Sequence, residues 1–127
     1  MDRSPEDERI GKAILAAAMH VHSSLGPGLL ESAYEACLAY ELEKSGLLVH
    51  KQLSLPLDYD NVRLEVGFRI DLLVGNRVVV EVKTVEKFLP IHLAQILSYL
   101  KLGKYPLGFL LNFNVTHMRQ GIKRVVA

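Results

Sequence analysis

Residues 62–83 constrain the fold more than any other part of the chain. From Val62 to Val74 every even position is apolar, while the odd positions hold arginine, glutamate, glycine, aspartate and one leucine. A period of two over this length indicates a strand with one buried face. After a short polar break, a second apolar set follows at even positions: Val78, Val80 and Val82. The two runs predict an antiparallel hairpin.

The register of this hairpin follows from keeping both apolar sets on one face. Directly opposed residues lie on the same side of a sheet, so Val74 must oppose Val78 across a three-residue loop, 75–77. A slip of one residue would turn every side chain to the other face. The same register predicts that Asp71 lies opposite Glu81, with the two Cβ atoms roughly 5 Å apart.

Lys83 lies two positions beyond Glu81 and therefore on the same predicted face as Asp71 and Glu81. Two adjacent carboxylates are the hard oxygen ligands that Mg²⁺ prefers, so the pattern predicts a divalent-metal site. The alternative is a solvated hairpin face on which Glu65 and Arg69 add ion pairs of little energetic value. The hairpin alone leaves both interpretations open.

The composition is that of one globular domain, which we expect to span residues 1–127. Half of the residues are hydrophobic and 23% are charged, which excludes a disordered chain. The formal net charge is only +1, so a nucleic-acid surface must be a local patch. The single cysteine, Cys37, excludes a disulfide or zinc framework. The acidic start and the lack of a long apolar run predict a cytoplasmic protein without membrane contact.

Periodicity and breaker residues predict the order helix, helix, three strands, helix, strand. Ser4-Pro5 begins the first helix, and Gly26-Pro27-Gly28 ends it. Pro56 places the first strand at a sheet edge, while the strand at 107–115 is apolar on both faces and belongs inside the sheet. The remaining expected elements are a helix over 29–45, strands over 47–59, 62–74 and 78–83, a helix over 90–102, and a short strand within the basic tail 117–124.

Two groups of polar residues lie outside the hairpin. On the helix at 90–102, Gln95 and Tyr99 are four residues apart, beside a stripe that we expect in the core: Leu93, Ile96, Leu97 and Leu100. We expect this helix to pack next to the carboxylates. In the tail, His117 lies near further basic residues that either contact phosphates or form a solvated end: Arg119, Lys123 and Arg124. His20 and His22 point in different directions on their helix, which argues against a metal-binding pair.

These residues resemble the core of the PD-(D/E)XK nuclease superfamily. Asp71 and the Glu81-Val82-Lys83 run match its motif, with Ile70 in place of the proline. The Gln95-Ile96-Leu97-Ser98-Tyr99 run is similar to the Gln-x-x-x-Tyr element of nuclease domains attached to recombination helicases. The Gly28-Leu29-Leu30-Glu31-Ser32-Ala33-Tyr34 run looks like the signature of the GxxExxY proteins, a small branch of the superfamily. The resemblance covers nearly the whole chain.

The resemblance implies an α/β fold with a restriction-endonuclease-like core, helix, three strands, helix and strand, plus an extra N-terminal helix and a mixed central sheet. It also implies metal-dependent hydrolysis of phosphodiester bonds in DNA, with RNA as the second choice. Asp71, Glu81 and the Val82 carbonyl would bind Mg²⁺ or Mn²⁺, and Glu31 would reach the metal directly or through water.

The resemblance further implies roles for three other side chains. Lys83 would position or help to deprotonate the attacking water, Gln95 would orient the lysine or a phosphate, and Tyr99 would support Gln95. Two other function classes stay open: a nucleic-acid-binding module without turnover, and a protein-interaction domain of the same fold. The expected partners are nucleic acid, with DNA before RNA, and a second copy of the chain in a homodimer.

Overall fold

The computed structural model describes residues 4–127, and its elements follow the predicted order. They are α1 (Pro5–Leu25), α2 (Glu31–Lys44), β1 (Val49–Tyr59), β2 (Val62–Val74), β3 (Val78–Lys83), α3 (Pro90–Gly103), β4 (Leu107–Asn112), the 3₁₀ turn η1 (Met118–Gly121) and β5 (Ile122–Val126). The strands form one sheet in the order β1-β2-β3-β4-β5. Only the β3–β4 pair is parallel, so the sheet is mixed, as expected.

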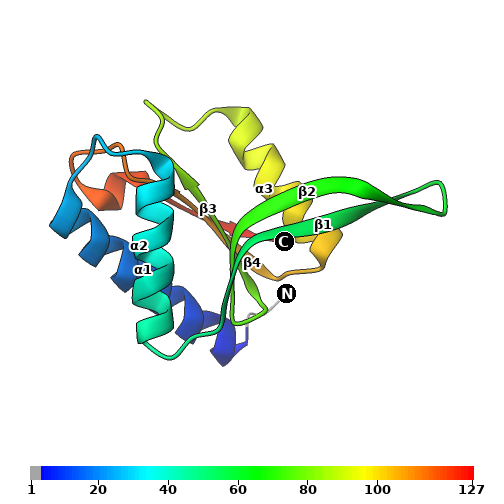
Figure 1. The fold of residues 1–127 in the computed structure, drawn as a ribbon, viewed down its shortest axis with the longest axis horizontal. Helices are drawn as coiled ribbons and strands as arrows, with labels where there is room; N and C mark the ends of the chain where they lie inside the picture. The colour runs from blue at the N-terminus through cyan, green and yellow to red at the C-terminus, as the bar shows by residue number, and fades with distance from the viewer. Residues whose placement is uncertain (1–3) are drawn as a thin grey trace.

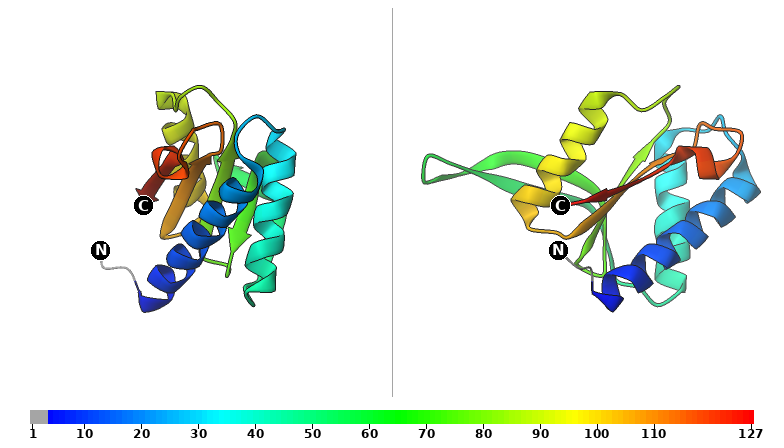
Figure 2. Two further views of the ribbon diagram at one scale, coloured as in Figure 1. Left: turned by 90° about the vertical axis from the view of Figure 1, so that its left-hand side faces the viewer. Right: turned by 180° about the vertical axis from the view of Figure 1, so that it is seen from behind.

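Helices cover both faces of the sheet (Figure 1; Figure 2, left). On one face, α1 and α2 pack on alternate residues of β2, β3 and β4 in the larger apolar cluster. On the other face, α3 packs through Ile96, Tyr99 and Leu100. Leu97, which the sequence places in the core stripe of this helix, is 40% exposed. Tyr99 takes a core position instead, and its ring contacts Phe68 of β2.

Two strands have the predicted place in the sheet, but one of them is shorter than predicted. β1 is an edge strand and β4 an interior one, as predicted. However, β4 ends at Asn112, because the buried Asn112 side chain accepts the N–H groups of Val85 and Asn114 and donates to the Val85 carbonyl. Residues 113–115 therefore leave the sheet.

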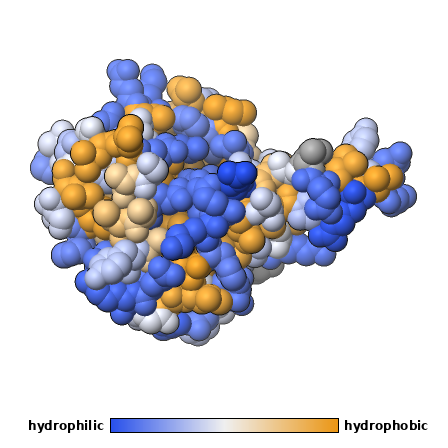
Figure 3. Space-filling view, in the orientation of Figure 1, coloured by the Kyte–Doolittle hydropathy of each residue, from blue (hydrophilic) through white to orange (hydrophobic). Residues whose placement is uncertain are grey.

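The outer parts of β1 and β2 form an arm that projects from the body of the molecule (Figure 1). Asp60 and Asn61 both have positive φ angles and form a two-residue turn at its tip. In the space-filling view the arm carries both hydrophilic and hydrophobic residues (Figure 3). Val62 is 53% exposed there, so the predicted buried face of residues 62–74 does not extend along the whole strand.

The β2–β3 hairpin has the predicted register. Val74 opposes Val78 across the loop, and the ladder continues to the pair Leu72–Val80, where it ends. Beyond that point β2 pairs only with β1 and turns away from β3. Ile70 consequently packs in the α3-side cluster, although Leu72 packs on the α1 and α2 side. The predicted alternation fails at the place where the two strands separate.

The loop of this hairpin is held by α1. Gly75 and Asn76 have positive φ angles, and Arg77 reaches the buried carboxylate of Asp7 through both its Nε and Nη2 atoms. Asp7 also forms a capping box with Ser4 at the start of α1. One ion pair therefore fixes the hairpin loop and the first helix to each other.

Replacing Arg77 by alanine should destabilise the protein, because the buried Asp7 carboxylate loses its charged hydrogen-bond donor. Chemical denaturation at neutral pH measures the change. The Arg77 hydrogen bonds hold the pKa of Asp7 below its usual value. The effect should therefore shrink as the pH falls through the folded-state pKa of Asp7. Arg63→Ala on the exposed arm is the control, and equal losses in both variants would contradict this role for Arg77.

Candidate functional site

Asp71 and Glu81 lie where β2 separates from β3, one residue beyond the last ladder pair. The backbone N–H of Asp71 donates to Glu81 Oε2 over 2.9 Å, and the backbone N–H of Val82 donates to Asp71 Oδ2 over 2.8 Å. Each carboxylate therefore accepts a hydrogen bond from the opposite strand, in place of a main-chain ladder bond. This arrangement keeps the two acids next to each other.

The pair is crowded and largely shielded from water. Glu81 is only 3% exposed, and burial followed by the negative charge of Asp71 raises its pKa to about 8. Burial also raises the pKa of Asp71, against the opposing effects of the Val82 N–H and the Lys83 charge. Two negative charges at this position are unfavourable without a nearby cation.

Lys83 supplies part of that positive charge from the end of β3. Its ammonium group lowers the pKa of both carboxyl groups, so it acts on Asp71 and Glu81 together. The side chain is only partly exposed. Its carbonyl accepts the N–H of Phe113 over 3.0 Å, which ties this strand end to the segment after β4. The three hairpin residues predicted from the sequence are therefore brought together.

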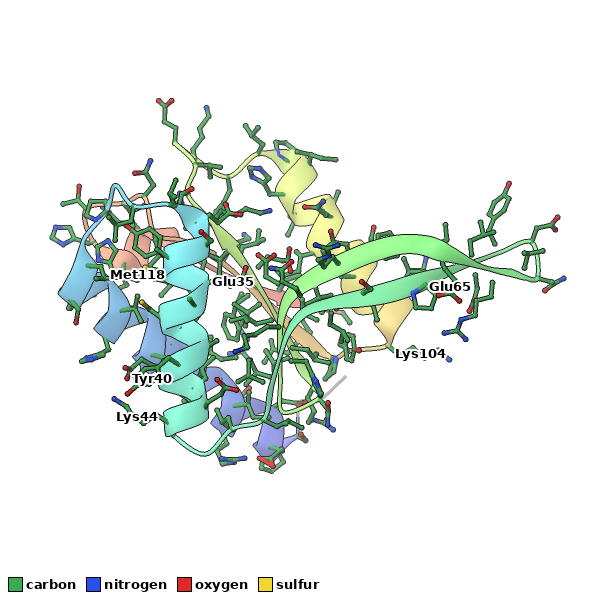
Figure 4. All side chains as sticks on the ribbon, viewed as in Figure 1. Glu35, Tyr40, Lys44, Glu65, Lys104 and Met118 are labelled. Atoms are coloured by element: carbon green, nitrogen blue, oxygen red, sulfur yellow. The ribbon has the colours of Figure 1, made fainter. Side chains whose placement is uncertain are left out.

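On α2, the structure brings Glu35 close to the pair, one helical turn after the predicted Glu31. Burial raises the pKa of Glu35, and the charges of Asp71 and Glu31 add to this effect. Glu31 is exposed and lies near Glu35. Figure 4 shows Glu35 on the side of α2 toward the strands. The four-residue spacing of Glu31 and Glu35 was a signal that could have identified Glu35.

Gln52 joins Glu35 to Asp71, and nothing in the sequence pointed to it. Its Nε2 atom donates to Glu35 Oε1 and Oε2 at 2.9 and 2.7 Å, and to Asp71 Oδ1 at 3.5 Å. Lys51 pairs with Leu72 and Leu53 with Ile70, so Gln52 lies opposite Asp71. Its φ angle is 51°, in the left-handed region that a non-glycine residue rarely adopts. Such strain is often found at functional positions.

Tyr99 of α3 lies on the other side of the pair and is 6% exposed. Burial, followed by the charges of Glu81 and Asp71, raises its pKa. Its ring contacts Phe68 with a centroid distance of 5.3 Å. Gln95, one turn earlier, is exposed and lines a cavity of about 250 Å³ with Phe68 and Tyr99. The structure thus brings Tyr99 to the carboxylates and leaves Gln95 farther out on the same helix.

The site offers the kind of oxygen ligands that a divalent metal prefers, but its side chains are not arranged as a complete coordination shell. Within residues 4–127, no three acidic, histidine or cysteine side chains are arranged as a ready metal cage. However, the buried Glu81 and the half-buried Asp71 are oxygen donors with raised pKa values, and Glu35 is linked to Asp71 through Gln52. A hard cation would relieve this crowding of carboxylates.

The raised pKa of Glu81 has a consequence for stability. In the unfolded chain this carboxyl loses its proton near its ordinary value of 4.5, whereas in the folded protein it keeps the proton up to about pH 8. Between these values the folded state binds more protons, so the metal-free protein should lose stability as the pH rises.

Glu81→Gln should therefore be more stable than wild type at about pH 8 in a chelating buffer, with a gain of several degrees in Tm at about 4 °C per kcal/mol. The gain should shrink as the pH falls and should vanish well below 4.5, the ordinary pKa of this carboxyl, where it is protonated in both states. Thermal denaturation across this range measures it. Glu65→Gln on the exposed arm is the control (Figure 4), and a gain that is independent of pH would contradict the assignment.

Comparisons with known proteins agree with this arrangement. A family profile described as the PD-(D/E)XK nuclease superfamily matches residues 8–125. Comparison with curated proteins and with solved structures gave no match. No helix among the described residues is long and apolar enough to cross a membrane. The profile spans nearly the whole chain, from α1 to β5, and the mixed sheet carries the Asp71 and Glu81-Val82-Lys83 elements at one point; the chain therefore belongs to the PD-(D/E)XK nuclease superfamily.

Proposed function

We propose that this protein is a divalent-metal-dependent nuclease that hydrolyses phosphodiester bonds of DNA, with RNA as the second substrate class. The observation that carries the proposal is the shielded Asp71/Glu81 pair at the separation of β2 and β3, with Lys83 beside it. Acids whose pKa values are raised by burial, as both are, and by a neighbouring negative charge, as that of Glu81 is, are common at functional sites. Superfamily membership makes a nuclease the leading interpretation of such a site.

Asp71, Glu81 and the backbone carbonyl of Val82 are the groups that we propose to hold Mg²⁺ or Mn²⁺. Each carboxylate keeps one oxygen that is not bonded to the backbone, Asp71 Oδ1 and Glu81 Oε1. When bound, such an ion lowers the pKa of a water and polarises the phosphate. The protein supplies a partly dry site in which the carboxylates are already held in place by backbone N–H groups.

Lys83 is proposed to hold the attacking water and to balance negative charge that develops on the phosphate. Its charge already acts on both carboxyl groups, which supports a position beside the reacting atoms. Tyr99 covers the site from the α3 side, and Gln95 lies one turn away on the same helix, from where we propose that it contacts a phosphate or the lysine. We propose that both help to orient the substrate.

Glu35 is proposed as the carboxylate of α2 that completes the site, with Glu31 in a supporting position. Gln52 holds Glu35 through two hydrogen bonds and reaches Asp71 with the same nitrogen. The amide therefore occupies a place between two carboxylates that a cation would also favour. This contact supports Glu35 over Glu31, whose charge acts on Glu35.

Three finer expectations from the sequence stay predictions. Tyr34 supports membership of the GxxExxY branch. Its hydroxyl accepts the Leu29 N–H and donates to the Gly26 carbonyl, and its ring stacks on the Phe113 ring with a centroid distance of 4.6 Å. These contacts give the tyrosine of that signature a structural purpose, since they hold the loop before Glu31. The other two expectations are a homodimer and a cytoplasmic location.

Purified wild type should cleave DNA in the presence of Mn²⁺, and Asp71→Asn, Glu81→Gln and Lys83→Met should each lose roughly 100-fold or more of the rate. Assays on single-stranded, duplex and branched DNA and on RNA define the substrate.

Mn²⁺ should raise the Tm of wild type and of the lysine variant by mass action, and should raise that of the acid variants less. Glu65→Gln should behave as wild type. Metal stabilisation without cleavage would support a module without turnover, and neither effect would support an interaction domain.

Glu35→Gln and Glu31→Gln form a matched pair one helical turn apart. Glu35→Gln should reduce cleavage roughly tenfold or more, as loss of a group that orients metal ligands does, and Glu31→Gln should have the smaller effect. Titration of Mn²⁺ against Tm, with cleavage rates for both variants, measures the difference. A larger loss of cleavage in Glu31→Gln than in Glu35→Gln would assign the role at the metal site to Glu31 instead.

A further inference from the structure

A cavity of about 460 Å³ lies between the carboxyl end of α1 and the segment that follows β4. Its polar lining comes from both sides: His22 and Ser23 from α1, and Thr116, His117 and Arg119 from the segment before β5. Figure 4 shows Met118, another lining residue, beside α1. None of these residues belongs to the proposed catalytic site.

The lining has the chemistry of an anion site. It combines the guanidinium of Arg119, the imidazoles of His22 and His117 and two hydroxyl groups, and its lining residues include no aspartate or glutamate. His22 is only 8% exposed, and its Nε2 atom donates to the Val115 carbonyl over 2.7 Å. This bond holds one wall of the cavity against the other.

The structure places the residues of the basic tail in different environments, whereas the sequence alone left open whether they contact phosphates or form a solvated end. Arg119 and His117 lie at the cavity, whereas Arg124 belongs to β5 and pairs with Glu8 of α1 over 2.6 Å. Lys123 is exposed on β5. The tail is therefore neither one continuous phosphate-binding group nor a uniformly solvated end, and only its first part faces a concave site.

Phe113 connects this cavity to the proposed catalytic site. Its N–H donates to the Lys83 carbonyl over 3.0 Å, and its ring stacks on Tyr34, the residue before Glu35. On the side of the cavity, the same ring lies 6.4 Å from the His22 ring. The parallel strands β3 and β4 both have their carboxyl ends at this end of the sheet. The cavity and the carboxylates therefore belong to one packed unit.

A nucleic acid at the catalytic site needs an anchor of this kind. At the site, Asp71, Glu81 and Glu35 are offset by Lys83 and by the proposed divalent ion, and the whole chain has a net charge of only +1. Phosphates of the substrate that flank the scissile bond would therefore gain no net attraction there unless further cations are placed near by. General attraction by the whole protein surface cannot supply them.

We propose that the cavity binds a phosphate group of the nucleic-acid strand, through Arg119 and His117, while the strand lies across the Asp71/Glu81 site. The substrate role rests on the proposed function. The phosphate can come from two sources: an internal phosphodiester of the strand, or a phosphorylated strand end. Both are recognised by the same charged hydrogen-bond donors, and substrates with different ends distinguish them.

The test compares Arg119→Gln and Arg119→Gln/His117→Asn with Lys12→Gln, which removes one charge from α1. Lys12 is exposed and lies about 15 Å along the helix from His22. Fluorescence anisotropy with a labelled single-stranded oligonucleotide, in the Asp71→Asn background, gives affinities over a range of salt concentrations. Arg119→Gln should weaken binding several-fold at low salt and reduce the slope of log K against log salt by about 0.7, the value for one lost phosphate contact on a single strand. Lys12→Gln should change neither quantity.

A second measurement tests phosphate binding in the cavity independently of nuclease activity. Inorganic phosphate alone should raise the Tm of the wild-type protein and that of Lys12→Gln, and should do so much less for the Arg119 variants. If phosphate binds through Arg119 and no nucleic acid is cleaved, the nuclease proposal fails while the anion site stands. If wild type cleaves DNA and the Arg119 variants match Lys12→Gln in affinity, salt slope and phosphate response, the cavity proposal is overturned and the nuclease proposal stands.

Strand ends identify the source of the phosphate. Circular single-stranded DNA, a 5′-phosphorylated oligonucleotide and its 5′-hydroxyl counterpart are compared as ligands. An equal loss for all three in Arg119→Gln supports an internal phosphodiester, and a loss confined to the phosphorylated oligonucleotide supports a terminal phosphate.

Discussion

The pair of crossed hydrogen bonds between Asp71 and Glu81 and the opposite backbones is the interaction on which the site depends. Each carboxylate takes the N–H of the neighbouring strand at the point where the main-chain ladder stops. The bonds satisfy buried donors that would otherwise be orphaned, which would cost about 1–3 kcal/mol each. They also place two acids in a partly dry position where their negative charges repel each other.

The surrounding elements are arranged around this crowding. Lys83 offsets part of the charge from β3, Gln52 bridges from β1 to Glu35 of α2, and Tyr99 covers the opposite side from α3. The strained backbone at Gln52 is maintained because its amide has two carboxylate partners. The site is therefore assembled from five elements, β1, β2, β3, α2 and α3, with the β2–β3 hairpin as its centre, and a bound cation would relieve its crowded negative charge.

Sequence reasoning succeeded where local periodicity carried the information. The apolar alternation predicted the Val74–Val78 pairing, and with it the proximity of Asp71 and Glu81. It failed at Ile70, because the strand separates from its neighbour there and periodicity assumes a continuous sheet. It also stopped short of Glu35 and Gln52, since both act through contacts between elements far apart in sequence.

By itself, the sequence determined the order of elements, the hairpin register and the association of two acids with a lysine, because a period of two leaves only one register that buries both apolar sets. The tertiary structure decided which helix acid lies at the pair, that Gln52 lies opposite Asp71, and that Arg119 and His117 face a cavity while Arg124 pairs with α1. These outcomes depend on how helices dock on the two faces of the sheet. Docking is set by the fit of many side chains from distant segments, which no local pattern encodes.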